Sequence, residues 1–420
     1  MLRVGLTAMG GSDWIAGVQY LHGLLYGHSL LSAEDEESLR LYLDPENHRI
    51  SDYREMRMFS AGIHVTDFSG AGSAPLYRKM RRIARTLLRE RRWPALPRLD
   101  LPRLLRKHRI DVLFAGTHLR PDIEIPQICW IPDFQHVYRT DFFSAEERHN
   151  RDQQFAQIMA EADRVIVSNQ CSYNDATRLY PGSRQKLAVL PFTMYLGRGW
   201  RSADAQQVVR KYNLPKKFLL FPSQFWKHKN HITVFQAIQL LHERGIDDAV
   251  LVCTGFAHDY RFPKHATELR EFLTAHKLES AVRMLGLLPR HDQVQLMRAA
   301  AAIVQPSLFE GWSAVVEECR SLGKLVFASD IPMHREQFAE RVHLFEPTSA
   351  EALADLLVEH WPELSPGPDP ELEAASEAQY HAGIREFARQ FIALCRSVVE
   401  TGARRTMEQA VLLVACCCPL

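Results

Sequence analysis

The sequence predicts an α/β protein of two domains, each with a doubly wound parallel sheet. A chain of 420 residues exceeds what one hydrophobic core usually holds, so we expect two domains. Short apolar runs alternate with longer amphipathic stretches, which is the pattern of βα units that build a parallel sheet. This series stops after Pro191 and opens again at Phe218. The interruption places one sheet in each half of the chain.

The first half contains a series of predicted buried strands with helices between them. Its N-terminus lacks the long apolar run and the small-residue cleavage site of a signal peptide, and instead is typical of a first strand. The predicted strands are residues 3–8, 39–43, 63–66, 111–115, 127–131, 164–168 and 186–190. The polar segment 197–202, which carries glycines and arginines, then breaks the pattern and is the predicted linker.

The second half repeats the alternation. Its predicted strands are residues 218–222, 249–254, 282–286, 301–305, 325–328 and 343–345. Proline spacing predicts a loop at 365–370, and a final helix is expected from 371 to 400. The predicted division is therefore one domain at 1–195, a second at 196–380, and a terminal helix with its tail at 381–420.

The composition is that of a globular protein without a strongly charged surface. Positive and negative side chains nearly cancel, at a net charge of +1, so we expect no nucleic-acid partner. No apolar run approaches the length of a membrane span, which predicts a cytoplasmic protein. A basic amphipathic helix is predicted at 76–92, either as a solvated face packed on the sheet or as a peripheral contact with an anionic membrane. The cysteines have no zinc-type spacing, and no metal site is predicted.

Residues 306–318, between a predicted strand and a helix, are the most informative segment. Glu310 in the loop and Glu318 on the helix stand eight residues apart. A loop at the carboxyl end of a parallel strand is where open α/β sheets bind ligands. Gly311 and Ser313 are small enough for backbone N–H groups at the helix N-terminus to approach an anion. Carboxylates in this position can accept hydrogen bonds from sugar or ribose hydroxyls.

This segment resembles the Glu-x7-Glu signature of glycosyltransferase family 4, including its Glu-Gly-aromatic loop, in which Trp312 is the aromatic residue. The resemblance implies the GT-B architecture, in which two Rossmann-like domains face each other across a cleft. It also implies that Glu310 faces the hydroxyls of a donor sugar and that Glu318 faces the ribose hydroxyls. The nucleobase would lie near Leu287 and Leu288.

A second similarity to this family lies in the segment 218–231, which opens the second half. The family usually presents an Arg and, five residues later, a Lys to the donor diphosphate, where they stabilise the charge on the leaving group. Lys229 matches the Lys, whereas Gln224 stands at the Arg position. Lys227 is a candidate to replace the missing charge. The alternative is a surface loop that happens to be basic.

The first predicted strand is followed by Gly10, Gly11 and Ser12, which resemble the family's N-terminal glycine loop. Residues this small permit close approach to a phosphate or a sugar. Trp14 and Ile15 stand where a GxGxxG pattern would need glycine, which disfavours a dinucleotide-dependent dehydrogenase. A simple tight turn is the alternative interpretation.

Asp133 and His136 are candidate catalytic residues in the segment 129–144. The family often carries a His-Asp pair there that points into the cleft, whereas this chain has Pro132 before Asp133 and a histidine three residues later. Both side chains are predicted to face the acceptor or the sugar, with a structural loop role as the alternative.

Taken over nearly the whole chain, the resemblance implies a hexosyltransferase that retains anomeric configuration. Residues 1–195 would take a glycan, lipid-linked or small-molecule acceptor, as in polysaccharide synthesis, and 196–380 the nucleotide sugar. The terminal helix would pack back on the first domain. No D-x-D motif is present, so a metal-independent reaction without a cofactor is expected. Gln224 and Pro132 leave open a nucleotide-sugar- or glycan-binding protein with weakened or no catalysis, and a nucleotide-sugar epimerase of the same architecture is the other alternative.

Overall fold

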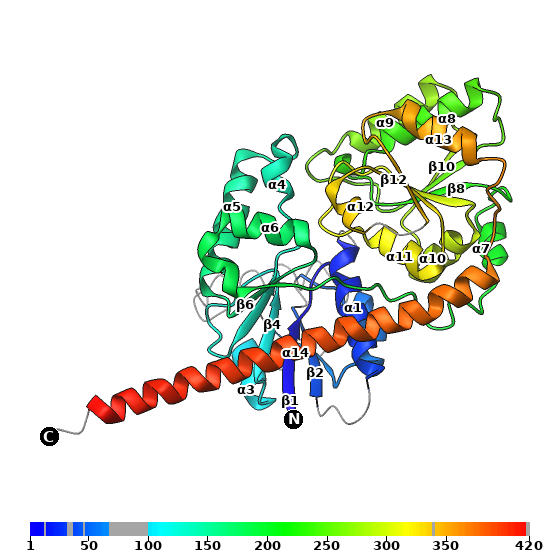
Figure 1. Cartoon of the computed structure of the whole chain (residues 1–420). Helices are drawn as coiled ribbons and strands as arrows, with labels where there is room; N and C mark the ends of the chain where they lie inside the picture. Colours follow the sequence, from blue (N-terminus) through cyan, green and yellow to red (C-terminus); the bar gives the residue numbers. More distant parts are fainter. Residues whose placement is uncertain (12–13, 32–36, 45–46, 67–99, 338–340, 417–420) are drawn as a thin grey trace, which may run out of the picture.

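The computed structural model confirms the predicted fold class, with two separate parallel sheets covered by helices (Figure 1). The residues described are 1–11, 14–31, 37–44, 47–66, 100–337 and 341–416, with side chains as far as residue 402. The predicted basic helix at 76–92 and the candidate site residue Ser12 lie outside them.

The first sheet has seven strands in the order β3-β2-β1-β4-β5-β6-β7, each parallel to its neighbours. The strands are β1 (Leu2–Thr7), β2 (Glu37–Leu43), β3 (Ile63–Val65), β4 (Val112–Gly116), β5 (Gln127–Trp130), β6 (Arg164–Val167) and β7 (Leu187–Val189). The helices are α1 (Ile15–Ser29), α3 (Leu101–Lys107), α4 (Gln135–Tyr138), α5 (Ala145–Glu161) and α6 (Gln170–Leu179), with 3₁₀ helices η1 (Ile50–Tyr53), η2 (Glu55–Met58), η3 (Thr140–Phe142) and η4 (Pro181–Lys186).

The second sheet has six strands in the order β10-β9-β8-β11-β12-β13, again parallel. The strands are β8 (Leu219–Pro222), β9 (Leu251–Thr254), β10 (Val282–Gly286), β11 (Ala302–Gln305), β12 (Val326–Ser329) and β13 (Val342–Phe345). The helices are α7 (Ala205–Lys211), α8 (His231–Glu243), α9 (His265–Ala275), α10 (Arg290–Ala299), α11 (Ala314–Leu322), α12 (Pro332–Glu336) and α13 (Ala350–His360), with η5 (Lys227–Lys229) before α8.

Every predicted strand is present, with ends that differ by at most two residues. This agreement follows from burial: β4 and β11 are buried along their whole length, so both alternate faces of each strand must be apolar or small. Helix α11 is equally well specified. The Ser313 hydroxyl accepts a hydrogen bond from the Val316 N–H at its start, and Gly323, at φ +64°, ends it in the left-handed conformation.

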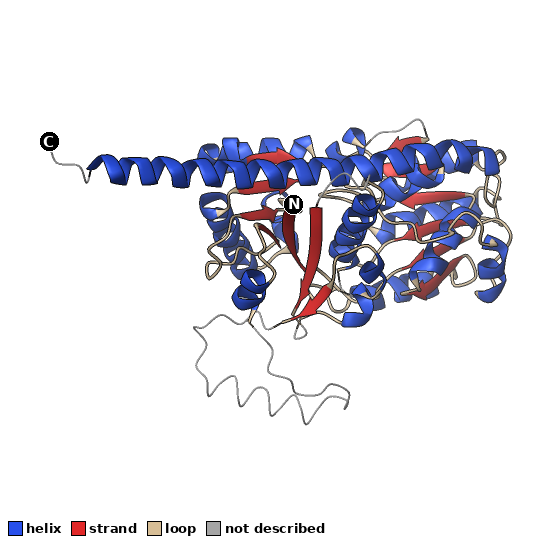
Figure 2. Ribbon diagram, turned by 90° about the horizontal axis from the view of Figure 1, so that it is seen from below, coloured by secondary structure: helices blue, strands red, loops and turns tan. Residues whose placement is uncertain are grey.

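The long helix α14 (Pro370–Cys416) joins the two halves of the molecule (Figures 1 and 2). Near its start Glu373 pairs with Arg298 of α10, at 2.7 Å between Oε1 and Nε. Further along, Phe387 and Phe391 enter the core of the first sheet. Helix α14 begins at Pro370, within the predicted second domain (196–380), and continues beyond Glu400, the predicted end of the final helix. No helix within the described residues is long and apolar enough to cross a bilayer.

Candidate active site

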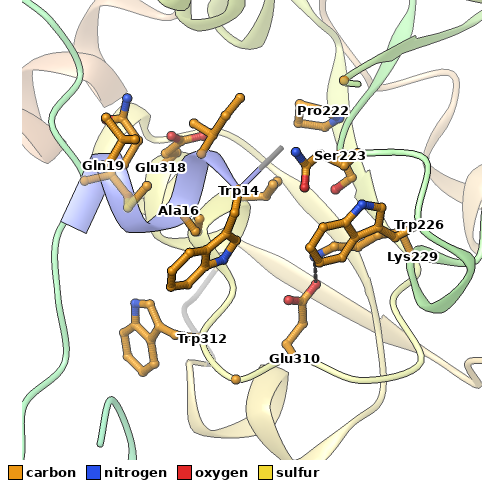
Figure 3. Close-up of a pocket in the computed structure, with 18 of the residues that line it drawn as sticks. Trp14, Ala16, Gln19, Pro222, Ser223, Trp226, Lys229, Glu310, Trp312 and Glu318 are labelled. Atoms are coloured by element: carbon orange, nitrogen blue, oxygen red, sulfur yellow. Dashed lines mark hydrogen bonds and ion pairs between the residues drawn. The ribbon is translucent and has the colours of Figure 1, made fainter. Parts of the chain in front are cut away.

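A pocket of about 400 Å³ lies between the two sheets and is walled by loops from both (Figure 3). Its residues come from the ends of, or the segments after, β1, β2, β5 and β7 in the first sheet, and β8, β9, β10 and β11 in the second. All of these loops leave the carboxyl ends of parallel strands, where this kind of sheet binds ligands. The volume is within the range of small-molecule sites.

Most of the predicted site residues line this pocket. They are Gly11, Asp133, Gln224, Lys229, Leu287, Leu288, Glu310, Gly311, Trp312 and Glu318. Segments that are far apart in the sequence thus converge on one cavity, including the two glutamates and the lysine on which the functional prediction depends.

Glu310 and Lys229 form an ion pair, with 2.6 Å between the Lys229 Nζ and the Glu310 Oε1 (Figure 3). The same carboxylate oxygen accepts hydrogen bonds from Ser307 Oγ at 2.6 Å and Gln305 Nε2 at 2.8 Å. Both side chains are largely buried, with 7% of Glu310 and 17% of Lys229 exposed. Because Gln305 and Ser307 come from the end of β11, the strand itself fixes the carboxylate beside the ammonium group.

Glu318 is paired in the same way with a residue that sequence reasoning missed. Arg290, the first residue of α10, places Nη1 at 2.5 Å from Glu318 Oε1 and lines the pocket. Burial raises the pKa of the Glu318 carboxyl, and Arg290 opposes that rise. The available signal was the position of Arg290 directly after Leu287, Leu288 and Pro289, where a loop turns from a strand end into a helix.

The two halves of the pocket meet at Gly311. A β-carbon on this residue would stand 2.1 Å from the Pro132 carbonyl oxygen and 2.7 Å from the Asp133 Cβ. The Gly311 carbonyl also accepts a hydrogen bond from the side-chain amide of Asn169, the N-cap residue of α6. Glycine is therefore required here for close backbone contact across the cleft.

Asp133 lines the pocket but already has partners. Its Oδ1 accepts hydrogen bonds from Arg151 Nη2 at 2.7 Å and from the Gln135 backbone N–H at 2.9 Å. The carboxylate thus closes the N-terminal turn of α4, which fixes its position at the edge of the cavity.

The structure places His136 outside the pocket, contrary to its predicted orientation. Its ring is 2% exposed, donates through Nε2–H to Asp152 Oδ1 at 3.0 Å, and packs edge-on against Phe155. Burial lowers its pKa. The short helix α4 directs this side chain toward α5, where the imidazole contacts Asp152 and the Phe155 ring.

Three other predicted residues are near the pocket without lining it. The Lys227 ammonium lies over the Phe262 ring, 4.4 Å from its centre. The Ser313 N–H donates to Gln337 Oε1 at 2.8 Å and is already used. The Gly10 carbonyl accepts from the Tyr53 hydroxyl at 3.0 Å, which holds the glycine loop from below.

Aromatic side chains from both halves line the cavity, and sequence reasoning did not select them all. Trp14 stacks on Trp130 with 5.8 Å between ring centres. Trp226 lines the same pocket from the second half, across from Trp14 (Figure 3). The Trp312 indole N–H is anchored on the Phe192 carbonyl at 3.1 Å. Within the described part of the chain, no group of three or more His, Cys, Asp or Glu side chains is placed to hold a metal ion.

Comparison with known proteins places this geometry in context. Residues 203–360 match the family model described as glycosyl transferases group 1, and no curated protein sequence matches the chain. A glycosyltransferase from Rickettsia africae ESF-5 is similar in structure, with a TM-score of 0.63 and 13% identity over 95% of this chain and 98% of that one. Anabaena Alr3699/HepE, solved in complex with UDP and glucose, has a TM-score of 0.61 and 14% identity over 96% and 100%.

A putative UDP-N-acetylglucosamine 2-epimerase from Listeria monocytogenes also shares the fold, with a TM-score of 0.57 and 11% identity over 95% of this chain and 97% of that one. Likeness at such identities establishes the GT-B type of fold and leaves the activity to be argued from the site.

Proposed function

Because residues 203–360 match the group 1 glycosyl transferases, we propose that this protein transfers a hexose-type sugar from a nucleotide sugar to an acceptor held in the pocket between the sheets. The observation that carries the proposal is the pairing of Lys229 with Glu310 in that pocket. A cation fixed beside a carboxylate offers one group to a phosphate and another to sugar hydroxyls, within one cavity.

The donor is proposed to lie mainly on the second sheet. Lys229 meets the diphosphate, Glu310 the hydroxyls of the sugar and Glu318 those of the ribose, while the base lies near Leu287 and Leu288. When the donor binds, the diphosphate becomes a second anionic partner for the Lys229 ammonium and weakens its ion pair with Glu310. Since Gln305 and Ser307 still donate to Glu310, the carboxylate keeps partners when Lys229 turns to the phosphate.

The transfer step separates charge, which the site is arranged to balance. The bond between the anomeric carbon and the diphosphate oxygen breaks, and its electron pair stays on the diphosphate. The acceptor oxygen bonds to that carbon, and the proton of the acceptor hydroxyl passes to the departing diphosphate oxygen. Lys229 stabilises the departing diphosphate. We propose retention of configuration and no requirement for a metal ion, by analogy with the family that the two glutamates resemble. The acceptor, whether glycan, lipid-linked or small molecule, approaches along the first-sheet wall that includes Asp133.

A screen of nucleotide sugars tests the proposal. Purified protein is heated with UDP-, GDP- and ADP-glucose, with and without EDTA, and released nucleotide is followed by mass spectrometry. UDP-glucose comes first because the similar Anabaena protein was solved with UDP and glucose. Stabilisation by one nucleotide class that survives EDTA, with slow release of nucleotide, is the expected result. Absence of stabilisation by all three would contradict the proposal.

The fold shared with the Listeria protein makes an epimerase the second candidate. Including UDP-N-acetylglucosamine in the screen and following the sugar as well as the nucleotide separates the two, because an epimerase changes the configuration of the sugar whereas a transferase moves the sugar and leaves free nucleotide. Binding of a nucleotide sugar with neither conversion nor release would favour the non-catalytic alternative, and Gln224 would be the first residue to restore to arginine.

A further inference from the structure

The pocket contains two ion pairs of similar form. Among the described residues that line it, Lys229 and Arg290 are the lysine and arginine side chains, and each lies beside one of the two glutamates. The Lys229 pair joins the 3₁₀ helix η5 to the loop after β11. The Arg290 pair, in contrast, joins the first residue of one helix to the middle of another. This second pair has no part in the proposed transfer step, and its function needs a separate account.

Both terminal amino groups of Arg290 are engaged. Nη1 lies 2.5 Å from Glu318 Oε1, and Nη2 donates to the Tyr195 carbonyl at 2.9 Å. Tyr195 lies in the segment between β7 and α7 that connects the two sheets. A guanidinium is planar and presents its donors in a fixed fork, so two acceptors on opposite elements define its orientation. The fork therefore holds the Glu318 carboxylate at one point relative to the connecting segment.

Glu318 is 7% exposed and still lines the pocket. A buried carboxylate without a partner favours its neutral form, and a neutral carboxyl offers a hydroxyl group less acceptor capacity. The ion pair of Oε1 with Arg290 favours the charged form of the carboxylate, in which Oε2 can accept a further hydrogen bond.

From these contacts we infer that Arg290 is a positioning residue, which orients the Glu318 carboxylate toward the ribose hydroxyls of the nucleotide and thereby sets the preference for a ribonucleotide. The inference rests on the proposed function and adds a residue to it. The rival role is direct contact of Arg290 with the diphosphate, in place of the arginine missing at Gln224. The two roles differ in which part of the nucleotide depends on Arg290.

The test measures the affinity of the full chain for UDP and for 2′,3′-dideoxy-UDP by calorimetry. The wild-type protein is expected to bind UDP roughly 10- to 100-fold more tightly than dideoxy-UDP, because only UDP has ribose hydroxyls that can donate hydrogen bonds to the Glu318 carboxylate. In Arg290→Gln this ratio is expected to fall close to one, through weaker UDP binding with little change for the dideoxy form. Arg290→Lys is expected to keep an intermediate ratio, because an ammonium group keeps the charge without the fork.

The matched control is Arg320→Gln. Arg320 pairs with Glu317, the neighbour of Glu318 on α11, at 3.3 Å and with similar exposure, but neither residue lines the pocket. This variant should keep the wild-type ratio, with any loss of thermal stability similar to that of Arg290→Gln. Equal weakening of UDP and dideoxy-UDP in Arg290→Gln would overturn the positioning role. Failure of the wild-type protein to bind UDP, GDP or ADP would instead overturn the proposed function itself.

Discussion

The backbone of Pro132, in the first half of the molecule, touches Gly311 in the second so closely that a single β-carbon would stand 2.1 Å from the Pro132 carbonyl oxygen. This contact lies at the edge of the pocket, one residue from Glu310 and one from Asp133. The relative position of donor-side and acceptor-side groups therefore depends on the absence of a side chain at one residue.

Gly311→Ala is expected to lower turnover by about 100-fold, because a displacement of about an ångström between reacting groups has effects of that size. Affinity for the nucleotide should change little, since the donor residues lie on the second sheet. Turnover and nucleotide affinity are to be measured on the same preparation. Gly182→Ala is the control, because a β-carbon there meets nothing within 4 Å. Wild-type turnover in Gly311→Ala would show that the contact is not needed.

Lys229→Ala removes the cation proposed to stabilise the departing diphosphate. Turnover is expected to fall about 100- to 1000-fold, as for the loss of one group that stabilises charge in a transition state. The melting temperature should stay close to that of the wild type, because Gln305 and Ser307 still donate to Glu310. Steady-state kinetics and thermal denaturation check both statements.

Lys211→Ala provides the comparison for this variant. Lys211 forms an ion pair with Asp292 at the same 2.6 Å, but 55% of its side chain is exposed and it does not line the pocket. Its loss should leave turnover unchanged. If Lys229→Ala is as active as Lys211→Ala, Lys229 has no part in the reaction.

The strands and the position of the pocket were predictable because they depend on local pattern. Runs such as 302–305 are buried on both faces and are apolar almost throughout, so alternation with helical stretches reveals them. The loops after such strands must converge at one edge of a parallel sheet. Local pattern and the family resemblance together therefore suffice to assign Lys229, Glu310 and Glu318 to one site.

What the sequence did not reveal depends on contacts between distant elements. Arg290 could not be paired with Glu318, because their contact depends on where the start of α10, the middle of α11 and the connecting segment lie in space. His136 lies three residues after Asp133, outside the family's His-Asp pattern, and α4 directs its side chain to Asp152. The continuation of α14 beyond Glu400 was missed because its last residues, 410–416, are too uniformly apolar in sequence to show a helical period.

Affinity for nucleotide is expected to fall as the pH is lowered. The fall should begin at a pH above the range in which an ordinary glutamate carboxyl is protonated. Burial raises the pKa of Glu318, and protonation removes both its ion pair with Arg290 and an acceptor for the ribose. In Arg290→Gln the loss should begin at higher pH, because the group that opposes the rise is gone. Calorimetric titrations over a pH series test this, with Glu318→Gln as the reference for protonation of the nucleotide itself. Parallel profiles for wild type and Glu318→Gln would exclude the carboxyl as the titrating group.

Arg298 should have a larger effect on stability than any residue of the pocket. It is 4% exposed, pairs with the 3% exposed Glu373 at the start of α14, and also donates to the carbonyls of Trp200 and Arg201 in the connecting segment. Arg298→Met leaves a buried carboxylate without its partner, which costs about 3–5 kcal/mol of unfolding free energy. Urea denaturation followed by circular dichroism measures the loss.

The control for this variant lies on α14, the helix that carries Glu373. Arg389 pairs with Glu386, with 61% and 49% of the two side chains exposed, so Arg389→Met should change the unfolding free energy by less than about 1 kcal/mol. The double variant Arg298→Met, Glu373→Leu removes both buried charges and is expected to recover much of the loss, because the cost comes from the unpaired charge and not from the absence of the pair. Equal midpoints for Arg298→Met and Arg389→Met would mean that α14 is held to the second sheet by its apolar contacts alone.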